Sequence, residues 1–317
     1  PYRRVAELRP ERTPRIRDRL AAITDVQPAL AGGWQVLADL AYHDQDYPAA
    51  VDHYQKLDEL GALEPLMRLQ WGRALFEKGE PGRAVDAARE LLDMPIHYAA
   101  ILQLCEDVLR RHPAAWSAQI LRVDVFVAQE RPDDALEVIQ TMLEEAPRQT
   151  PEAMEDIAIR IISRLDLLGH RVSSPGEAHL AWARASTWVQ EPEKARDHAM
   201  TAWQLTPVLA TDVAAVLRTA LELDDEMIRA YRDLAEVETS VGHYGTALHV
   251  LEDLRHQAPD HEEIKEGVLR VLEALETVGD DAALVRSSLG DALQQACLMM
   301  ATELTPEYPL RAMKYLS

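Results

Sequence analysis

Residues 231–259 read YRDLAEVETSVGHYGTALHVLEDLRHQAP, and this stretch decides the fold. Apolar and small side chains recur at helical spacing on both sides of Val241-Gly242-His243, which interrupts the pattern. Two amphipathic segments separated by a short turn predict a helical hairpin, which Pro259 closes. A hairpin of this length cannot bury its apolar face alone, so we expect further copies to pack against it.

Working outward, the same pattern recurs in four more segments of the chain. Small residues lie 34 positions apart in the first two hairpins, at Ala38 and Gly72 and again at Ala50 and Ala84. This period is typical of a stacked helical repeat. Small side chains allow two helices to approach closely, while bulky ones fill the groove between them. In three hairpins we expect the second helix to begin with a proline, at Pro81, Pro132 and Pro192.

Additional helical segments interrupt this period. They are predicted at about residues 96–111, 151–168 and 210–223, so successive hairpins begin near residues 65, 116, 176 and 228. This spacing favours a three-helix unit over a two-helix unit. It leaves two alternatives open: either the superhelix is irregular, or some hairpins pair across these boundaries. We divide the chain into a basic lead and helix (1–30), two hairpins (31–95), an irregular region (96–260) and C-terminal helices that are a candidate cap (261–317).

The hairpins resemble tetratricopeptide repeats, and the resemblance covers about half of the chain clearly. It implies an all-α fold, a right-handed α-solenoid of helical hairpins. The residues that carry it are Trp34, Ala38, Tyr47, Ala50, Tyr54, Gly72, Ala84, Pro95, Ala135, Pro147, Ala183, Ala195, Pro207, Tyr231, Ala235, Tyr244, Ala247 and Pro259.

The resemblance also implies a function, because this family usually binds a peptide or a helix of another protein in a concave groove lined by the first helices. The set of Lys and Asn residues with which some members grip a C-terminal carboxylate is missing, and the chain has only five Lys. We therefore expect a partly apolar partner segment. The corresponding groove candidates are Gln35, Asp39, Tyr42, Leu69, Arg73, Phe76, Asp124, Arg184, Trp188, Arg232 and Glu236.

Charge and composition restrict the class of partner. The net charge of −21 argues against general binding to nucleic acid, which needs clustered Lys and Arg. Between Pro1 and Thr24, however, seven arginines face three acidic residues, which suits either a solvated first helix or a basic arm beside a membrane. No run of 18 apolar residues is present. We expect a cytoplasmic protein, with a fragment of a larger or membrane-anchored protein as the alternative.

The sequence shows no chemistry of its own. It contains no Walker loop, no Gly-x-Gly-x-x-Gly, no His-Glu-x-x-His and no Gly-x-Ser-x-Gly. Cys105 and Cys297 are expected to be free thiols. We therefore predict no catalytic residue, no metal site and no cofactor, and a non-enzymatic scaffold for protein–protein interaction. The alternatives are a self-assembling homo-oligomer, and a regulatory or membrane-tethered assembly-factor domain of a larger protein.

Six tryptophans could suggest a stacking surface for sugars or bases. Trp34, Trp71 and Trp182 fall on the faces that the repeat pattern assigns to the core, so we expect them to be packed. Trp188 lies near the end of a first helix, and we expect its side chain to be exposed in the groove.

Overall fold

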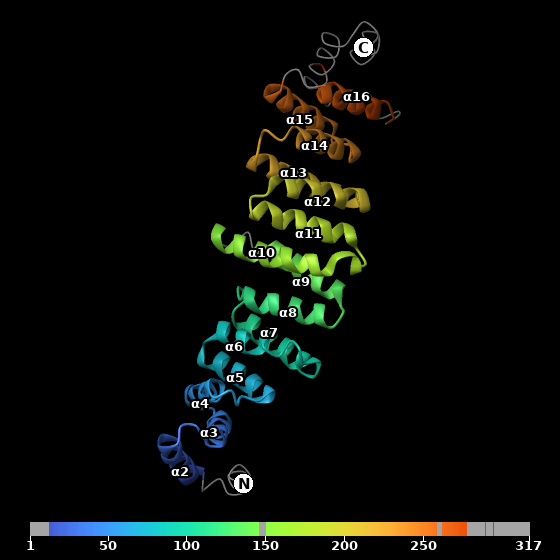
Figure 1. The fold of residues 1–317 in the computed structure, drawn as a ribbon. Helices are drawn as coiled ribbons and strands as arrows, with labels where there is room; N and C mark the ends of the chain where they lie inside the picture. Colours follow the sequence, from blue (N-terminus) through green and yellow to red (C-terminus); the bar gives the residue numbers. More distant parts are fainter. Residues whose placement is uncertain (1–12, 146–149, 259–261, 278–288, 290–293, 295–317) are drawn as a thin grey trace. The chain divides into compact units, whose positions relative to one another are not determined.

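A computed structural model describes residues 13–145, 150–258, 262–277, 289 and 294. The described residues form α-helices and short 3-10 turns without any strand (Figure 1). The helices are α2 (Thr13–Val26), α3 (Ala31–His43), α4 (Tyr47–Glu59), α5 (Pro65–Lys78), α6 (Pro81–Arg89), α7 (Tyr98–Arg111), α8 (Trp116–Ala128), α9 (Pro132–Glu145), α10 (Pro151–Leu168), α11 (Pro175–Trp188), α12 (Pro192–Leu205), α13 (Ala210–Leu223), α14 (Ile228–Ser240), α15 (Tyr244–Gln257) and α16 (Glu262–Thr277).

The predicted all-α array of helical hairpins is confirmed. Hairpins form where predicted, as α3–α4, α5–α6, α8–α9, α11–α12 and α14–α15. The helices α6, α9 and α12 begin at the predicted prolines, because the first helical turn needs no N–H from its first residue. Most of the predicted C-terminal helices after Thr277, and Cys297 with them, lie outside the described residues.

The turns inside the hairpins share one backbone geometry. In the α14–α15 turn, the His243 N–H donates to the Glu238 carbonyl at 2.9 Å and the Gly242 N–H donates to Thr239 at 3.1 Å. These bonds satisfy carbonyls at the end of α14 and require a left-handed residue, which is Gly242 with φ of 83°. The corresponding residues of the other turns also have positive φ, and they are Gln45, Gly79, Glu130 and Gln190.

The interspersed helices α7 and α13 contact the hairpins on both sides of them, and α10 contacts α11 of the hairpin that follows it. Helix α7 contacts both α5 and α6, α13 contacts both α11 and α12, and α16 contacts both α14 and α15. Helix α7 also contacts α8, and α13 also contacts α14, so each of them joins the hairpin before it to the hairpin after it. The first interspersed helix begins at Tyr98 and not at Ile96, because Pro95–His97 form a separate 3-10 turn.

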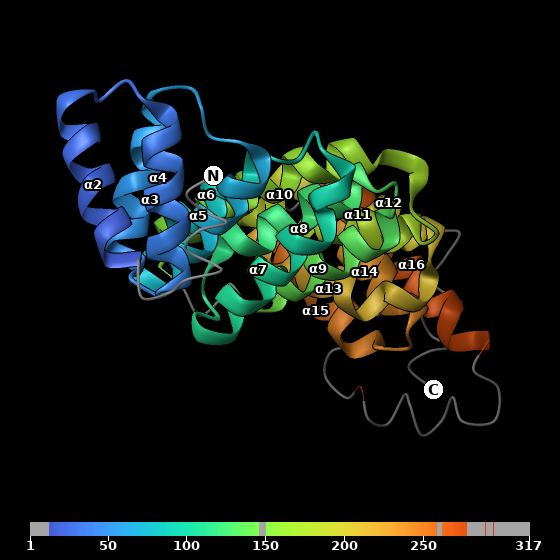
Figure 2. The ribbon, with the colours of Figure 1, turned by 90° about the horizontal axis from the view of Figure 1, so that it is seen from below.

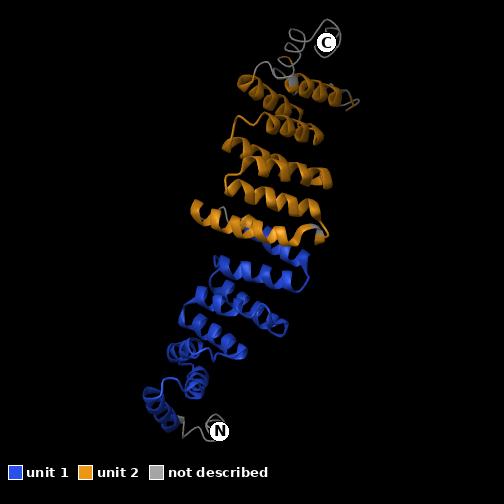
Figure 3. Cartoon of the chain, in the orientation of Figure 1, with its two compact units in different colours: residues 1–142 blue, residues 143–317 orange. Residues whose placement is uncertain are grey.

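The chain forms two compact units, Pro1–Met142 and Leu143–Ser317 (Figure 3). Unit 1 has a core of small and aliphatic side chains from α3 to α8, with Tyr54, Leu75 and Ile101 among its fully buried residues. At its start, α2 packs on α3 and α3 on α4 (Figure 2). Unit 2 has a separate core that runs from Leu180 to Leu275. Each unit thus buries its own apolar surface.

Candidate partner-binding site

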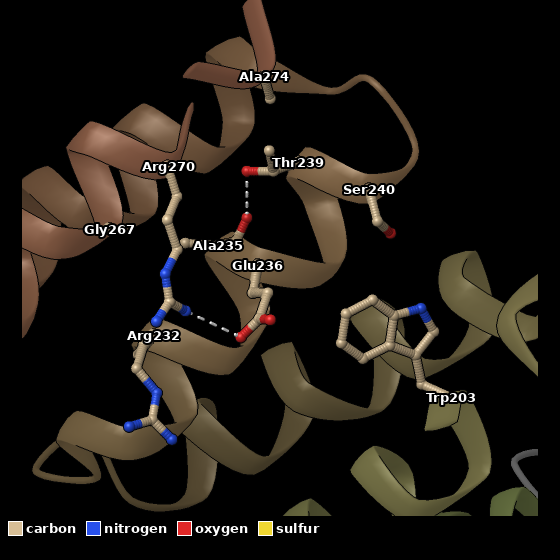
Figure 4. Close-up of a pocket in the computed structure, with 9 residues that line it drawn as sticks. All are labelled: Trp203, Arg232, Ala235, Glu236, Thr239, Ser240, Gly267, Arg270 and Ala274. Carbon is tan, nitrogen blue, oxygen red and sulfur yellow. Dashed lines mark hydrogen bonds and ion pairs between the residues drawn. The ribbon is translucent and has the colours of Figure 1, made fainter. Parts of the chain in front are cut away.

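A cavity of about 260 Å³ opens between three helices of unit 2. Helix α12 contributes Trp203 at one side, and α14 and α16 supply the rest of the lining (Figure 4). In the close-up, the indole ring of Trp203 lies across from Glu236. The lining residues are Trp203, Arg232, Ala235, Glu236, Thr239, Ser240, Gly267, Arg270 and Ala274.

Helical spacing places these side chains together. Arg232, Glu236 and Thr239 follow one another at four and three residues on α14 and therefore share one face. On α16, one face likewise carries Gly267, Arg270 and Ala274, which are three and four residues apart. The wall of the cavity is thus formed by two regular helix faces, which fixes the side chains more firmly than a loop would.

Gly267 allows α16 to approach α15 closely. A Cβ atom at this position would lie 2.6 Å from Cδ2 of Leu251, which is nearer than any normal contact. Leu251 itself is buried in the core of unit 2. The absence of a side chain at Gly267 therefore lets α16 settle on the hairpin and brings Arg270 to the cavity.

The two arginines of the cavity differ in how closely they are bound by carboxylates. Arg270 approaches Glu236 at 3.4 Å and Glu266 at 3.9 Å, and its side chain is 52% exposed. Arg232 is tied more closely, to Asp233 at 3.0 Å and to Glu263 at 3.1 Å. Because a guanidinium carries five N–H donors, Arg270 retains donors that a bound segment can use.

A buried ion pair lies beside the cavity and joins α12 to α14. The carboxylate of Asp233 is only 2% exposed and accepts from Arg196 of α12 at 2.5 Å and from Arg232 at 3.0 Å. Glu238 is also buried, and it accepts from Arg218 of α13 and from His243 at 2.8 Å. These pairs fix the positions of the three helices relative to one another, since breaking either would leave a buried charge uncompensated.

Residues 99–150 match the family model of the tetratricopeptide repeat, and this segment spans α7, α8 and α9. The chain contains a tetratricopeptide repeat. The hairpins on both sides of the matched segment have the same turn geometry, so the described residues form a helical repeat array of such hairpins with additional helices between them. No curated protein matches the chain significantly.

Several solved structures of tetratricopeptide proteins resemble this chain, with low sequence identities and low TM-scores. Yeast Tom70 is 13% identical, covers 98% of this chain and 81% of its own, and has a TM-score of 0.26. The C-terminal part of a TPR repeat-containing protein from Cytophaga hutchinsonii is 14% identical, with 88% and 98% covered and a TM-score of 0.21. A thermophilic TPR protein from Thermus thermophilus is 18% identical, with 77% and 98% covered and a TM-score of 0.19. At these scores, none supports a conclusion about function.

In unit 2, two of the groove candidates derived from the tetratricopeptide pattern line the cavity. These are Arg232 and Glu236. Arg184 instead pairs with Asp212 of α13 at 2.6 Å, so it helps to hold α11 and α13 together. Trp188 lies at the end of α11 with its side chain partly exposed, and it is not among the residues that line this cavity.

In unit 1, three groove candidates are buried, while partner binding by this set of residues stays a prediction. Asp39, Leu69 and Phe76 are less than a tenth exposed, so they offer a partner almost no surface. Phe76 lies beneath the guanidinium of Arg111, which is 4.4 Å from the ring centre. The spacing of residues along α5 could not show that Phe76 is covered, because the covering residue Arg111 belongs to α7. The other candidates of this unit are at least partly exposed, and they are Gln35, Tyr42, Arg73 and Asp124.

The sequence did not single out Trp203 or Arg270 for the site. Trp203 belongs to a second helix of a tetratricopeptide hairpin, whereas the family pattern directs attention to first helices. Of the tryptophans expected in the core, Trp71 is buried, while Trp34 and Trp182 are partly exposed. Trp182 stacks on His198 of α12, with ring centres 4.3 Å apart.

Two other kinds of feature are absent from the part of the chain that the structure describes. Among those residues, no three His, Cys, Asp or Glu side chains lie close enough together to hold a metal ion. Within the same residues, no helix has the length and apolar character required to cross a membrane.

Proposed function

We propose that the chain is a non-enzymatic interaction scaffold and that the cavity between α12, α14 and α16 receives a side chain from a peptide or helix of a partner protein. The size of the cavity carries this proposal. At about 260 Å³, it is smaller than the roughly 300–1,000 Å³ of pockets that hold small-molecule ligands. It has room for one or two side chains of a segment that lies along the helices.

The lining supports a partner segment of mixed character. The partly exposed indole of Trp203 offers an apolar face, and aromatic side chains with one polar end are enriched where proteins meet. Arg270 supplies hydrogen-bond donors at the opposite side. Thr239 and Ser240 donate to helix carbonyls at 2.6 Å, so their hydroxyl oxygens can still accept a bond from the partner.

The family supports the general role. Tetratricopeptide repeats generally act as protein–protein interaction scaffolds, and residues 99–150 match that family. The cavity lies on α12, α14 and α16, in a part of the chain that follows the matched segment.

Site-specific photocrosslinking tests the proposal. A photoreactive amino acid at Ser240, in the cavity lining, should crosslink a partner protein in cells that express the full chain. The same amino acid at His249, an exposed residue of α15 outside the lining, is the matched control. A purified partner should then lose at least about tenfold in affinity with Trp203→Ala plus Arg270→Ala, which is about 1.4 kcal/mol.

Two outcomes would contradict the assignment of the site. Equal crosslinking from positions 240 and 249 would show that the contact is not centred on the cavity. Unchanged affinity of the double variant, in a chain whose circular dichroism and unfolding temperature are preserved, would place the partner elsewhere.

A further inference from the structure

Two histidines of unit 2 face each other across the α11–α12 hairpin. Nδ1 of His179 lies 3.0 Å from Nδ1 of His198, which is hydrogen-bond distance. The centres of the two rings are 5.3 Å apart with 26° between their planes, and Trp182 covers His198 at 4.3 Å with an angle of 11° between the planes. Both histidines are partly buried, so solvent protons can reach the pair.

The geometry restricts how many protons the pair can hold. A hydrogen bond between two Nδ1 atoms needs a proton on one ring and a free lone pair on the other. Two neutral imidazoles satisfy this, and so does one imidazolium with one neutral ring. Two imidazolium rings do not, because each Nδ1 then carries a proton and the two positive charges face each other at 3.0 Å.

We propose that the His179–His198 pair is a proton-sensitive contact between α11 and α12, which is intact near neutral pH and is lost when the pair binds its second proton in the mildly acidic range. The first proton is tolerated because one imidazolium and one neutral ring can still share the hydrogen bond between the two Nδ1 atoms. The second proton removes this hydrogen bond and separates the two rings. This inference does not depend on the proposed partner site.

The surroundings of His198 act in the same direction. Burial lowers the pKa of His198 below its ordinary value of 6.5, and the neighbouring His179 lowers this pKa further. Asp197 of the same helix and Asp166 of α10 oppose these effects, while Lys194 adds to them. Because the pKa of His198 is lowered overall, protonation of this ring is less favourable in the folded chain than in the unfolded chain.

The sign of the pH dependence follows. Because the pKa of His198 is lower in the folded than in the unfolded chain, the unfolded chain binds more protons between the two values. The stability contributed by the neutral ring is fully present above pH 6.5 and is lost as the pH falls through the folded pKa.

The test is an NMR titration of the whole chain across the mildly acidic to neutral range, which follows the Cε1–H resonances of the histidines. His179 and His198 are assigned by the loss of their signals in His179→Asn and His198→Asn. We expect the pair to titrate in two steps separated by more than about one pH unit, as strongly coupled groups do.

The single variant sharpens the test. In His179→Asn, the like charge is gone, so the midpoint of His198 should move to higher pH and become a single step. The unfolding temperature of the wild type should also fall more than that of His179→Asn between about pH 7 and pH 5, by about 2–4 °C for each kcal/mol lost.

Independent, one-step titration of both rings in the wild type would overturn the proposal. So would a midpoint of His198 that stays unchanged in His179→Asn. The wild-type titration decides the question even if the variant does not fold, since it needs no substitution.

Discussion

Single residues set the turns of this array, because each hairpin turn requires one left-handed residue. Glycine meets the requirement without strain at Gly79 and Gly242, where φ is 93° and 83°. Gln45, Glu130 and Gln190 adopt the same region with a Cβ atom and therefore at an energetic cost. The tertiary contacts of the hairpins outweigh that cost.

Gly242→Ala should destabilise the chain. The left-handed backbone brings Cβ too close to the carbonyl, which costs roughly 1–2 kcal/mol. Gly82→Ala is the matched control, because Gly82 has no positive φ and a Cβ there meets nothing within 4 Å. We expect that control to stabilise α6 by about 0.4–1 kcal/mol. Urea unfolding measures both, and equal effects would contradict the assignment of strain to the turn.

Cys105 should be unreactive in the folded chain. Burial raises the pKa of its thiol to about 12, so almost no thiolate is present near neutral pH, and the thiolate is the reactive form. A thiol reagent added to a Cys297→Ser variant should label Cys105 only after denaturant is added. Rapid labelling in buffer alone would show that the α7 core opens far more often than its packing implies.

At the scale of elements, ion pairs join neighbouring helices, and some of these pairs are buried. Asp233 joins α14 to Arg196 of α12, and Glu238 joins α14 to α13. In unit 1, Arg111 of α7 binds Glu77 of α5 with two contacts of 2.9 and 3.1 Å. The Arg111–Glu77 and Arg270–Glu236 pairs each join residues 34 positions apart, which is one repeat period.

Asp233→Ala should cost about 3 kcal/mol, because it leaves the guanidinium of Arg196, only 17% exposed, without its buried partner. Asp107→Ala is the control. Asp107 pairs with Arg110 of the same helix, and the side chain of Arg110 is 69% exposed. That change should stay within about 0.5 kcal/mol. Chemical unfolding compares the two, and a similar cost for both would mean that the buried pair adds little.

At the scale of the whole molecule, two separate cores mean that stability is local. Each helix in a repeat array contacts only its neighbours, so a change is felt mainly by the elements packed beside it. The effect of a core substitution is therefore best followed by a measurement that resolves individual helices.

Leu75→Ala should confirm that the effect is local. Leu75 is fully buried in unit 1, so removing its side chain should cost about 2–5 kcal/mol there. Hydrogen exchange should accelerate across α5 to α7 and stay unchanged in α12 to α15. Asp233→Ala should give the reverse pattern, and acceleration spread evenly over both units would show that they unfold together.

The sequence by itself determined the helices, their hairpins and most of their ends. Helical periodicity, prolines at first turns and the turn residues are local signals, since a helix bonds residues only four apart. These signals placed α10 and α13 at their observed bounds and indicated the three-helix spacing. They also identified Arg232 and Glu236 as groove candidates, because the repeat pattern assigns these residues to an exposed helix face.

Only the tertiary structure decided which side chains meet. The cavity depends on α16 resting on Leu251 through Gly267, and on Trp203 reaching it from a second helix. The cover of Phe76 by Arg111 and the pairing of His179 with His198 likewise join different helices. Periodicity along one helix reports the direction of a side chain but not the identity of its neighbour, because helix packing sets that identity between residues far apart in sequence.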